Sequence, residues 1–127
     1  MAAFVLALHS GIRYLVLAAA VCTIVLGAIT RIRPAGRGLR GVWKGFVGLL
    51  DLQVLVGVVV LVTRPFQARF IGHFTMMLLA LAVAHAVGLA FRRRPPERQV
   101  GGALMAGALL ALVLVVGGIL AIGRPLI

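Results

Sequence analysis

Residues 100–122 read VGGALMAGALLALVLVVGGILAI, a run of apolar and small residues that contains no charge and no proline. A membrane hydrocarbon core about 30 Å thick is crossed by about 20 helical residues at a rise of about 1.5 Å each. Three earlier runs, residues 4–30, 46–63 and 70–91, are largely apolar and close to this length. We therefore predict an all-α integral membrane protein in which residues 1–127 form one domain of four transmembrane helices. Prolines interrupt helices, and all five lie outside the four runs: Pro34, Pro65, Pro95, Pro96 and Pro125.

The composition favours a lipid partner over a nucleic-acid partner. The chain has 13 Lys and Arg residues against two acidic residues, a formal net charge of +11, and 63% of its residues are hydrophobic. A soluble protein of this charge would be a candidate for binding nucleic acid. Here most basic residues lie between the apolar runs, so we expect them to meet the anionic headgroups of a bilayer and expect no nucleic acid. The single cysteine, Cys22, excludes an intrachain disulfide framework and a Cys-based metal site.

The basic residues are divided unequally between the two ends of the predicted bundle. Basic residues stay preferentially on the cytoplasmic side of a membrane. The distribution therefore predicts that the first and third connections are cytoplasmic and that both termini face outward from a bacterial inner membrane. Nine basic residues lie in those two connections, namely Arg31, Arg33, Arg37, Arg40, Lys44, Arg92, Arg93, Arg94 and Arg98, and four lie toward the other end, namely Arg13, Arg64, Arg69 and Arg124.

The remaining connection and the small residues indicate how the helices pack. The segment between residues 63 and 70 holds little more than a turn, which predicts antiparallel neighbours in an up-down four-helix bundle. The first run has no Lys or Arg in its first eight residues and stays apolar for eight residues past Cys22, so we expect no cleaved secretory signal. Small residues at four-residue spacing permit close helix packing in lipid, and they form three stripes: Ala80, Ala84 and Gly88; Ala82, Ala86 and Ala90; Gly107 and Ala111.

Two histidines are the first candidate site. Ionisable groups within membrane spans are costly, which makes each of them a functional candidate. His9 and His73 are expected at one level, about 5–8 Å below the outer face, on helices that occupy a diagonal of the bundle. Across a diagonal of about 11–14 Å, two imidazoles can serve as the axial ligands of haem b. The alternative is a pair of interfacial histidines that bind water or backbone without a cofactor.

Two arginines complete this candidate site. The propionates of a haem are anionic and would bind arginine at the outer surface. Arg13 follows His9 by one helical turn, and Arg69 lies at the outer end of the third run. Arg13 has an equally weighted alternative, in which it snorkels beside Tyr14 in the aromatic belt at the membrane interface.

A second pair of ionisable groups is expected toward the inner side. Asp51 and His85 lie at a similar depth on neighbouring helices, where a carboxylate and an imidazole can pair. The pair can be structural, or it can pass a proton. His73 and His85 are separated by about 18 Å along the helix axis, so they cannot share one metal.

Several segments also resemble a known family. The segment His9-Ser10-Gly11-Ile12-Arg13-Tyr14 resembles the His-x-x-x-Arg-aromatic motif of small four-helix bacterial membrane proteins, common in Bacteroidetes, that are labelled cytochrome b-like. Further segments resemble the second and third helices of that family, namely residues 52–57, Ala68-Arg69-Phe70, Gly72-His73-Phe74 and residues 76–80. The chain departs from the family pattern at Asp51, where a histidine is usual, and at Gly72, where a glutamate is usual. The resemblance implies a membrane b-type cytochrome or a relative of one.

Three functional hypotheses follow. The first is a haem-b-binding subunit that carries electrons in a respiratory or photosynthetic membrane complex, with no catalytic activity of its own. The second is a cofactor-free accessory subunit that packs against other membrane subunits. The third, a small proton-coupled exporter, rests only on Asp51 as its titrating group.

Overall fold

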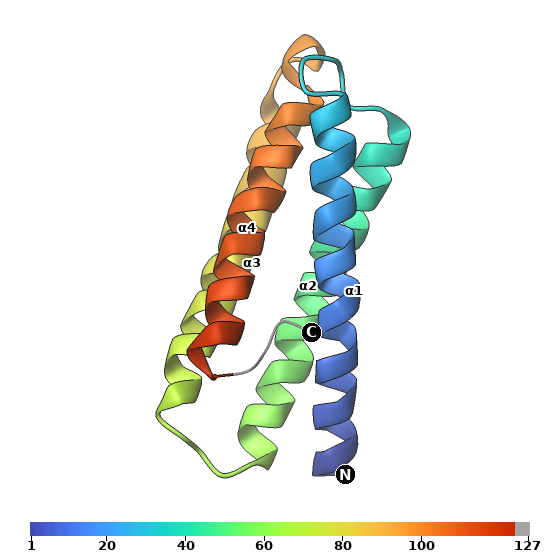
Figure 1. The fold of residues 1–127 in the computed structure, drawn as a ribbon. Coiled ribbons are helices and arrows are strands. Elements are labelled where there is room, and N and C mark those ends of the chain that lie inside the picture. Colours follow the sequence, from blue (N-terminus) through green and yellow to red (C-terminus); the bar gives the residue numbers. More distant parts are fainter. Residues whose placement is uncertain (124–127) are drawn as a thin grey trace.

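Four long α-helices make up the fold (Figure 1). The computed structural model describes residues 1–123. All four helices are long and apolar enough to cross a membrane. The predicted all-α four-helix fold is therefore confirmed, and the chain is a multi-pass membrane protein. The helices are α1 (Ala2–Ile29), α2 (Arg37–Thr63), α3 (Arg69–Arg93) and α4 (Gly101–Ala121), with a short 3-10 turn, η1 (Pro96–Arg98), before α4.

α1, α2 and α3 begin before their predicted apolar runs, whereas α4 lies one residue inside its run at each end. The largest difference is in α2, which begins at Arg37 rather than at residue 46. The predicted bounds marked the part of each helix that fills the hydrocarbon core, whereas a helix continues into the interface wherever its side chains can pack. Leu39 and Trp43 are buried in this added stretch of α2. Arg124 and Pro125, which entered the predictions above, lie outside the described residues.

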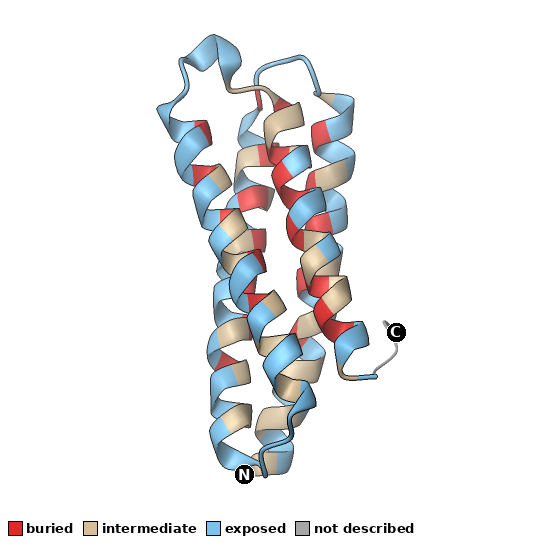
Figure 2. Ribbon diagram, turned by 90° about the vertical axis from the view of Figure 1, so that its left-hand side faces the viewer, coloured by how far each residue is buried: buried red, intermediate tan, exposed pale blue. Residues whose placement is uncertain are grey.

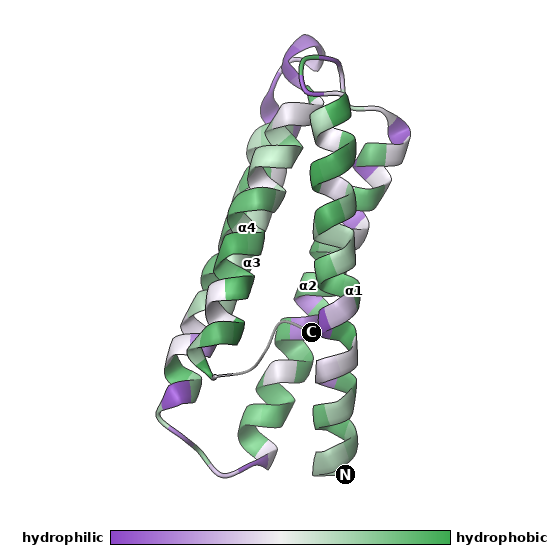
Figure 3. Cartoon of the chain, viewed as in Figure 1, coloured by the Kyte–Doolittle hydropathy of each residue, from purple (hydrophilic) through white to green (hydrophobic). Residues whose placement is uncertain are grey.

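The helices follow one another around the bundle in the predicted up-down order. α1 packs against α2 and α4, and α3 packs mainly against α4. Among adjacent helices, α2 and α3 contact each other least. α1 begins and α4 ends at the same end of the bundle (Figure 1). Apolar residues cover most of the helix surfaces and hydrophilic ones gather in the connections, as expected for helices that face lipid (Figure 3).

Hydrogen bonds join the two connections at one end of the bundle. We call this end, which holds residues 30–36 and 94–100, the basic end. The backbone N–H of Ala35 donates to the carbonyl of Gln99 at 2.8 Å, and the N–H of Gly101 donates to the carbonyl of Thr30 at 3.1 Å. The guanidinium of Arg40 donates to the Ala35 carbonyl at 2.9 Å and to Oε1 of Gln99 at 2.8 Å. It also lies 5.0 Å from the centre of the Phe91 ring. These contacts tie the two connections together.

The buried core lies toward the basic end. Buried residues line the inward sides of the helices and become sparse toward the end that holds the N-terminus (Figure 2). At the centre of this core, the rings of Trp43 and Phe46 lie 5.8 Å apart. Gly107 lets the side chains of Val87 and Trp43 pack directly against α4. A Cβ added at Gly107 would lie 2.5 Å from Cγ1 of Val87 and 3.2 Å from the Trp43 ring.

Two of the three predicted small-residue stripes lie in this packing. Ala80, Ala84 and Gly88 are buried, as are Gly107 and Ala111, which fits the close packing of α3 against α4. The stripe of Ala82, Ala86 and Ala90 lies on the exposed surface of α3.

Candidate functional site

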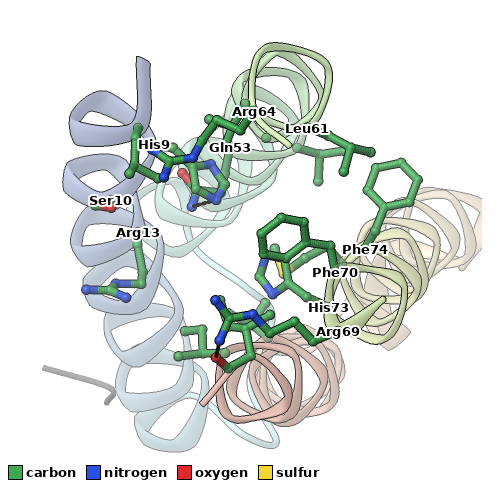
Figure 4. Close-up of a pocket in the computed structure, with 18 of the residues that line it drawn as sticks. His9, Ser10, Arg13, Gln53, Leu61, Arg64, Arg69, Phe70, His73 and Phe74 are labelled. Carbon is green, nitrogen blue, oxygen red and sulfur yellow. Dashed lines mark hydrogen bonds between the residues drawn. The ribbon is translucent and has the colours of Figure 1, made fainter. Parts of the chain in front are cut away.

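A cavity of about 490 Å³ lies near the end of the bundle opposite the basic end. All four helices line it. Its deepest walls are apolar and buried, with Val16 from α1, Met77 from α3 and Val115 from α4. Polar side chains enter it from α1, α2 and α3 (Figure 4). We call this space the outer cavity, after the predicted orientation.

His9 and His73 point toward each other within the outer cavity. His9 enters from α1 and His73 from α3, from opposite sides of the space (Figure 4). The centres of the two imidazole rings are 6.3 Å apart, and the ring planes are nearly perpendicular at 87°. The structure thus brings together the two histidines that the sequence placed at one level.

A backbone carbonyl orients His73. Nδ1 of His73 lies 2.8 Å from the carbonyl oxygen of Gly118. A carbonyl can only accept, so Nδ1 carries the proton and Nε2 is left with a lone pair. A Cβ added at Gly118 would lie 3.2 Å from Cβ of Met76 and 3.4 Å from Nδ1 of His73, so the glycine lets α3 and His73 approach α4 closely without a shift of either. Metal-binding histidines commonly donate their second ring nitrogen in this manner.

His9 packs against two residues of α2. A Cβ added at Gly57 would lie 3.1 Å from Cε1 of His9, so a larger residue there would require the imidazole to shift by a few tenths of an ångström. Nε2 of Gln53 lies 3.5 Å from Nε2 of His9. Gln53 is only 4% exposed, and its Oε1 is buried with no hydrogen-bond partner among the described residues.

Sequence reasoning did not identify Gln53 as a site residue. Gln53 is a neutral amide, whereas the sequence signal used for the candidate sites was an ionisable side chain within a span. An amide within an apolar run is nevertheless costly to bury without partners, so Gln53 carried a usable signal.

Arginines from three helices or their ends line the outer cavity. Arg13 donates to the hydroxyl of Tyr14 at 2.9 Å, and its guanidinium lies 4.8 Å from the centre of that ring. Its Nε atom is buried with no hydrogen-bond partner in the part of the chain that the structure describes. Arg69 lies 5.7 Å from the centre of the Phe70 ring and donates a long hydrogen bond, 3.4 Å, to the carbonyl of Ile122. Arg64 also lines the cavity.

Arg13 combines features of both of its predicted roles. Its stacking on Tyr14 is the contact expected of an interfacial anchor. Its position in the cavity wall and the unpartnered Nε are what an anion-binding arginine would offer. The two roles are compatible in one side chain.

No family model, curated protein or solved structure matches this chain. Across residues 1–123, no group of three or more His, Cys, Asp or Glu side chains could hold a metal ion. A zinc site draws at least three ligands from the protein. A haem brings four nitrogens of its own and needs only two axial ligands, which is the number that His9 and His73 can supply.

Asp51 and His85 meet outside the outer cavity. Nε2 of His85 lies 2.8 Å from Oδ1 of Asp51, so the predicted pair between α2 and α3 is formed. Neither residue lines the cavity. Their side chains are half-exposed, 48% for Asp51 and 56% for His85.

Proposed function

We propose that this chain is a membrane protein that binds haem b in the outer cavity, with His9 and His73 as the two axial ligands, and that it carries electrons. The observation that carries the proposal is the 6.3 Å separation of the two imidazole centres. The motif resemblance to cytochrome b-like proteins, described above, supports the same function. The basic connections support insertion in a bacterial inner membrane with the cavity toward the outer face.

The distance between the ring centres of His9 and His73 is close to the value expected for two imidazoles that bind one iron. A metal–imidazole bond is about 2 Å long, and a ring nitrogen lies about 1 Å from the centre of its ring. Two ligands on opposite sides of one iron therefore have ring centres about 6 Å apart. The ring centres of His9 and His73 are 6.3 Å apart, so one iron would fit between them if a ring nitrogen of each imidazole were turned toward it.

The rest of the outer cavity supports the same ligand. Its volume of about 490 Å³ is within the range of roughly 300–1,000 Å³ that small-molecule and cofactor sites occupy. Its walls are mostly apolar, which suits a macrocycle. Arg13, Arg64 and Arg69 line the same cavity, and guanidinium groups there can bind two propionates. The buried Nε of Arg13 has no hydrogen-bond partner among the described residues, so it could donate to a propionate.

A bound haem supplies one-electron redox chemistry. The chain's own residues bind and orient it. The Gly118 carbonyl keeps the proton of His73 on Nδ1 and holds the ring in position. Phe70, Phe74 and Met77 line the cavity on the side of α3 and would give a bound macrocycle apolar contacts.

A haemin titration of the purified protein tests this function. Absorption should show a saturable, one-to-one complex for the wild type. His73→Ala should lose the complex or leave an altered one, since a ligand is removed. His85→Ala is a matched control, because His85 lies on the same helix outside the cavity, and it should titrate like the wild type. A wild type that binds no haemin, or a His73→Ala variant with an unchanged spectrum, contradicts the proposal.

The second candidate function is a cofactor-free accessory subunit of a larger membrane complex. The exposed stripe of Ala82, Ala86 and Ala90 favours it, because small residues on a helix surface suit packing against another transmembrane helix. This function predicts co-purification with other membrane subunits and no haem absorption after expression with ample haem.

A further inference from the structure

The ion pair of Asp51 and His85 is placed where lipid would surround it. Asp51 lies seven residues after Lys44 on α2, and His85 lies seven residues before Arg92 on α3. At about 1.5 Å per residue, both side chains are about 10 Å along the helix from the last basic residue, within the apolar part of the spans. Yet about half of each side chain is exposed.

Such exposure is costly in a membrane. Ionisable residues within spans almost always face a bundle interior, a water-filled cavity or a partner. The 2.8 Å contact is the only hydrogen bond that either side chain makes within residues 1–123. It leaves Oδ2 of Asp51 and Nδ1 of His85 available. The outer cavity does not reach them, so these groups need cover from outside the chain.

The helix faces around the pair are also without partners. Along α2, Gly48, Leu55 and Val62 are exposed on the same side as Asp51. On α3, Leu78, Ala82, Ala86 and Leu89 are exposed around His85. We call this surface the α2–α3 face. It combines apolar residues, small residues and one central ion pair.

We propose that the α2–α3 face binds a second copy of this chain in a two-fold symmetric dimer within the membrane. All copies insert in the same direction, so a two-fold axis along the membrane normal brings equal depths together. The face presents an acceptor and a donor at one depth, which makes it complementary to itself. Oδ2 of each Asp51 then lies within hydrogen-bonding reach of Nδ1 of the other copy's His85.

The exposed small residues support a helix as the occupant. Ala82 and Ala86 follow the spacing that lets transmembrane helices approach closely. The basic residues nearest the pair, Lys44 and Arg92, lie toward the headgroups, where anionic lipid offsets their mutual repulsion. Packing and the two reciprocal hydrogen bonds therefore determine the association.

Cysteine cross-linking in vesicles tests where two copies meet. The probe is purified full-length protein in phosphatidylcholine vesicles at low protein-to-lipid ratio, with a short bis-maleimide reagent. Ala82→Cys in a Cys22→Ser background should form covalent dimers. The natural Cys22 is the matched control, because it is exposed on α1 at a comparable depth and α1 is diagonal to α3. Equal cross-linking at the two positions overturns the proposal.

Variants test whether the ion pair determines the dimer. Asp51→Asn combined with His85→Leu should raise the dimer dissociation constant about tenfold, because interhelical hydrogen bonds are lost. Exchanging the two residues, Asp51→His with His85→Asp, keeps the face self-complementary and should restore most of the association. Ala82→Phe should block the dimer sterically, whereas Ala18→Phe on the exposed side of α1 should not.

The remaining outcomes are also decisive. Wild type that stays monomeric in vesicles overturns the proposal. Cross-linking of Ala82→Cys to a different protein in native membranes, without homodimers, overturns it in favour of another subunit. Circular dichroism should show unchanged helix content in every variant, so that loss of the dimer is not loss of the fold. The result is independent of haem binding, which is measured separately by absorption.

Discussion

The bundle has two different halves, one near the basic end and one that holds the outer cavity. Glycines have a different role in each half. Near the basic end, glycines let helices pack directly, as at Gly107, and the connections are tied by the bonds of Arg40. Around the outer cavity, Gly57 and Gly118 instead admit imidazole rings. One half therefore holds the helices together, and the other half is left open enough to bind a ligand.

The comparison also explains why the cavity does not collapse. α2 and α3 have few contacts, but at the basic end Arg40 of α2 donates hydrogen bonds to Ala35 and to Gln99. The hydrogen bonds between residues 30–36 and 94–101 fix the positions from which the helices extend. We therefore expect changes near the basic end to affect stability, and changes around the outer cavity to affect binding.

The largest effect on stability is expected at Gly27. A Cβ there would lie 2.7 Å from Cβ of Met105 and 2.8 Å from the carbonyl oxygen of Gly101, so α1 and α4 must separate. Gly27→Ala should cost about 3 kcal/mol of unfolding free energy, at the upper end of overpacking costs. Gly11→Ala is the control, because a Cβ at Gly11 meets nothing within 4 Å, and it should be neutral or stabilising. Unfolding in detergent mixtures, followed by circular dichroism, compares the two. Equal stabilities would contradict the assignment of tight packing to this half.

The next effect concerns ligand binding through Gly118. Gly118→Ala should force α3 and α4 slightly apart, since the added Cβ would lie 3.2 Å from Cβ of Met76, and this shift should loosen the contact between His73 and the carbonyl that orients it. Loss of such an orienting contact typically weakens metal affinity about 10-fold to 100-fold. We expect haemin affinity to fall by about tenfold, with helix content unchanged, in an absorption titration. Unaltered affinity would show that the Gly118 contact does not orient the ligand.

A smaller effect on stability is expected at Arg40. Arg40→Ala removes two hydrogen bonds to residues 35 and 99 and the contact with Phe91. The group is partly exposed, so we expect a loss of about 1 kcal/mol. Haemin affinity should not change, because Arg40 is remote from the cavity. Arg37→Ala removes an equal charge from an exposed position and should leave stability close to that of the wild type. A fall in haemin affinity on Arg40→Ala would show that contacts at the basic end affect binding in the outer cavity, contrary to this account.

The smallest effect is expected at Gln53. Its replacement should leave stability unchanged or raise it, and should lower the affinity for haemin. In the ligand-free protein, Gln53→Leu removes a buried amide whose oxygen has no partner, so stability should be unchanged or rise by less than about 1 kcal/mol. Haemin affinity should fall a few-fold, because the amide near His9 is lost. A variant that loses stability would show that Gln53 serves the fold rather than the site.

Much of this architecture could be predicted from the sequence. The lengths of the apolar runs gave the four helices and their order, since each run had to cross the same thickness of membrane. Counting residues from the ends of the runs placed His9 and His73 at one level, and placed Asp51 near His85 in the same way. These predictions needed only the rise of a helix.

Other features depended on which side chains meet across helices, and a single sequence does not contain that information. His9 packs against Gly57, and His73 packs against Gly118. These contacts depend on how each helix is rotated about its axis, which the lengths of the apolar runs do not determine. The sparse contact between α2 and α3, which opens the cavity, has the same origin. The start of α2 at Arg37 was missed because only apolar residues were used to bound the helix.

Electron paramagnetic resonance of the oxidised, haem-loaded protein tests the central claim most directly. Two axial imidazoles predict a six-coordinate, low-spin ferric signal. The same measurement on His73→Ala should give a high-spin signal or none, while His85→Ala should keep the low-spin signal. A high-spin signal from the wild type, or a low-spin signal that survives the loss of His73 unchanged, would contradict ligation by His9 and His73.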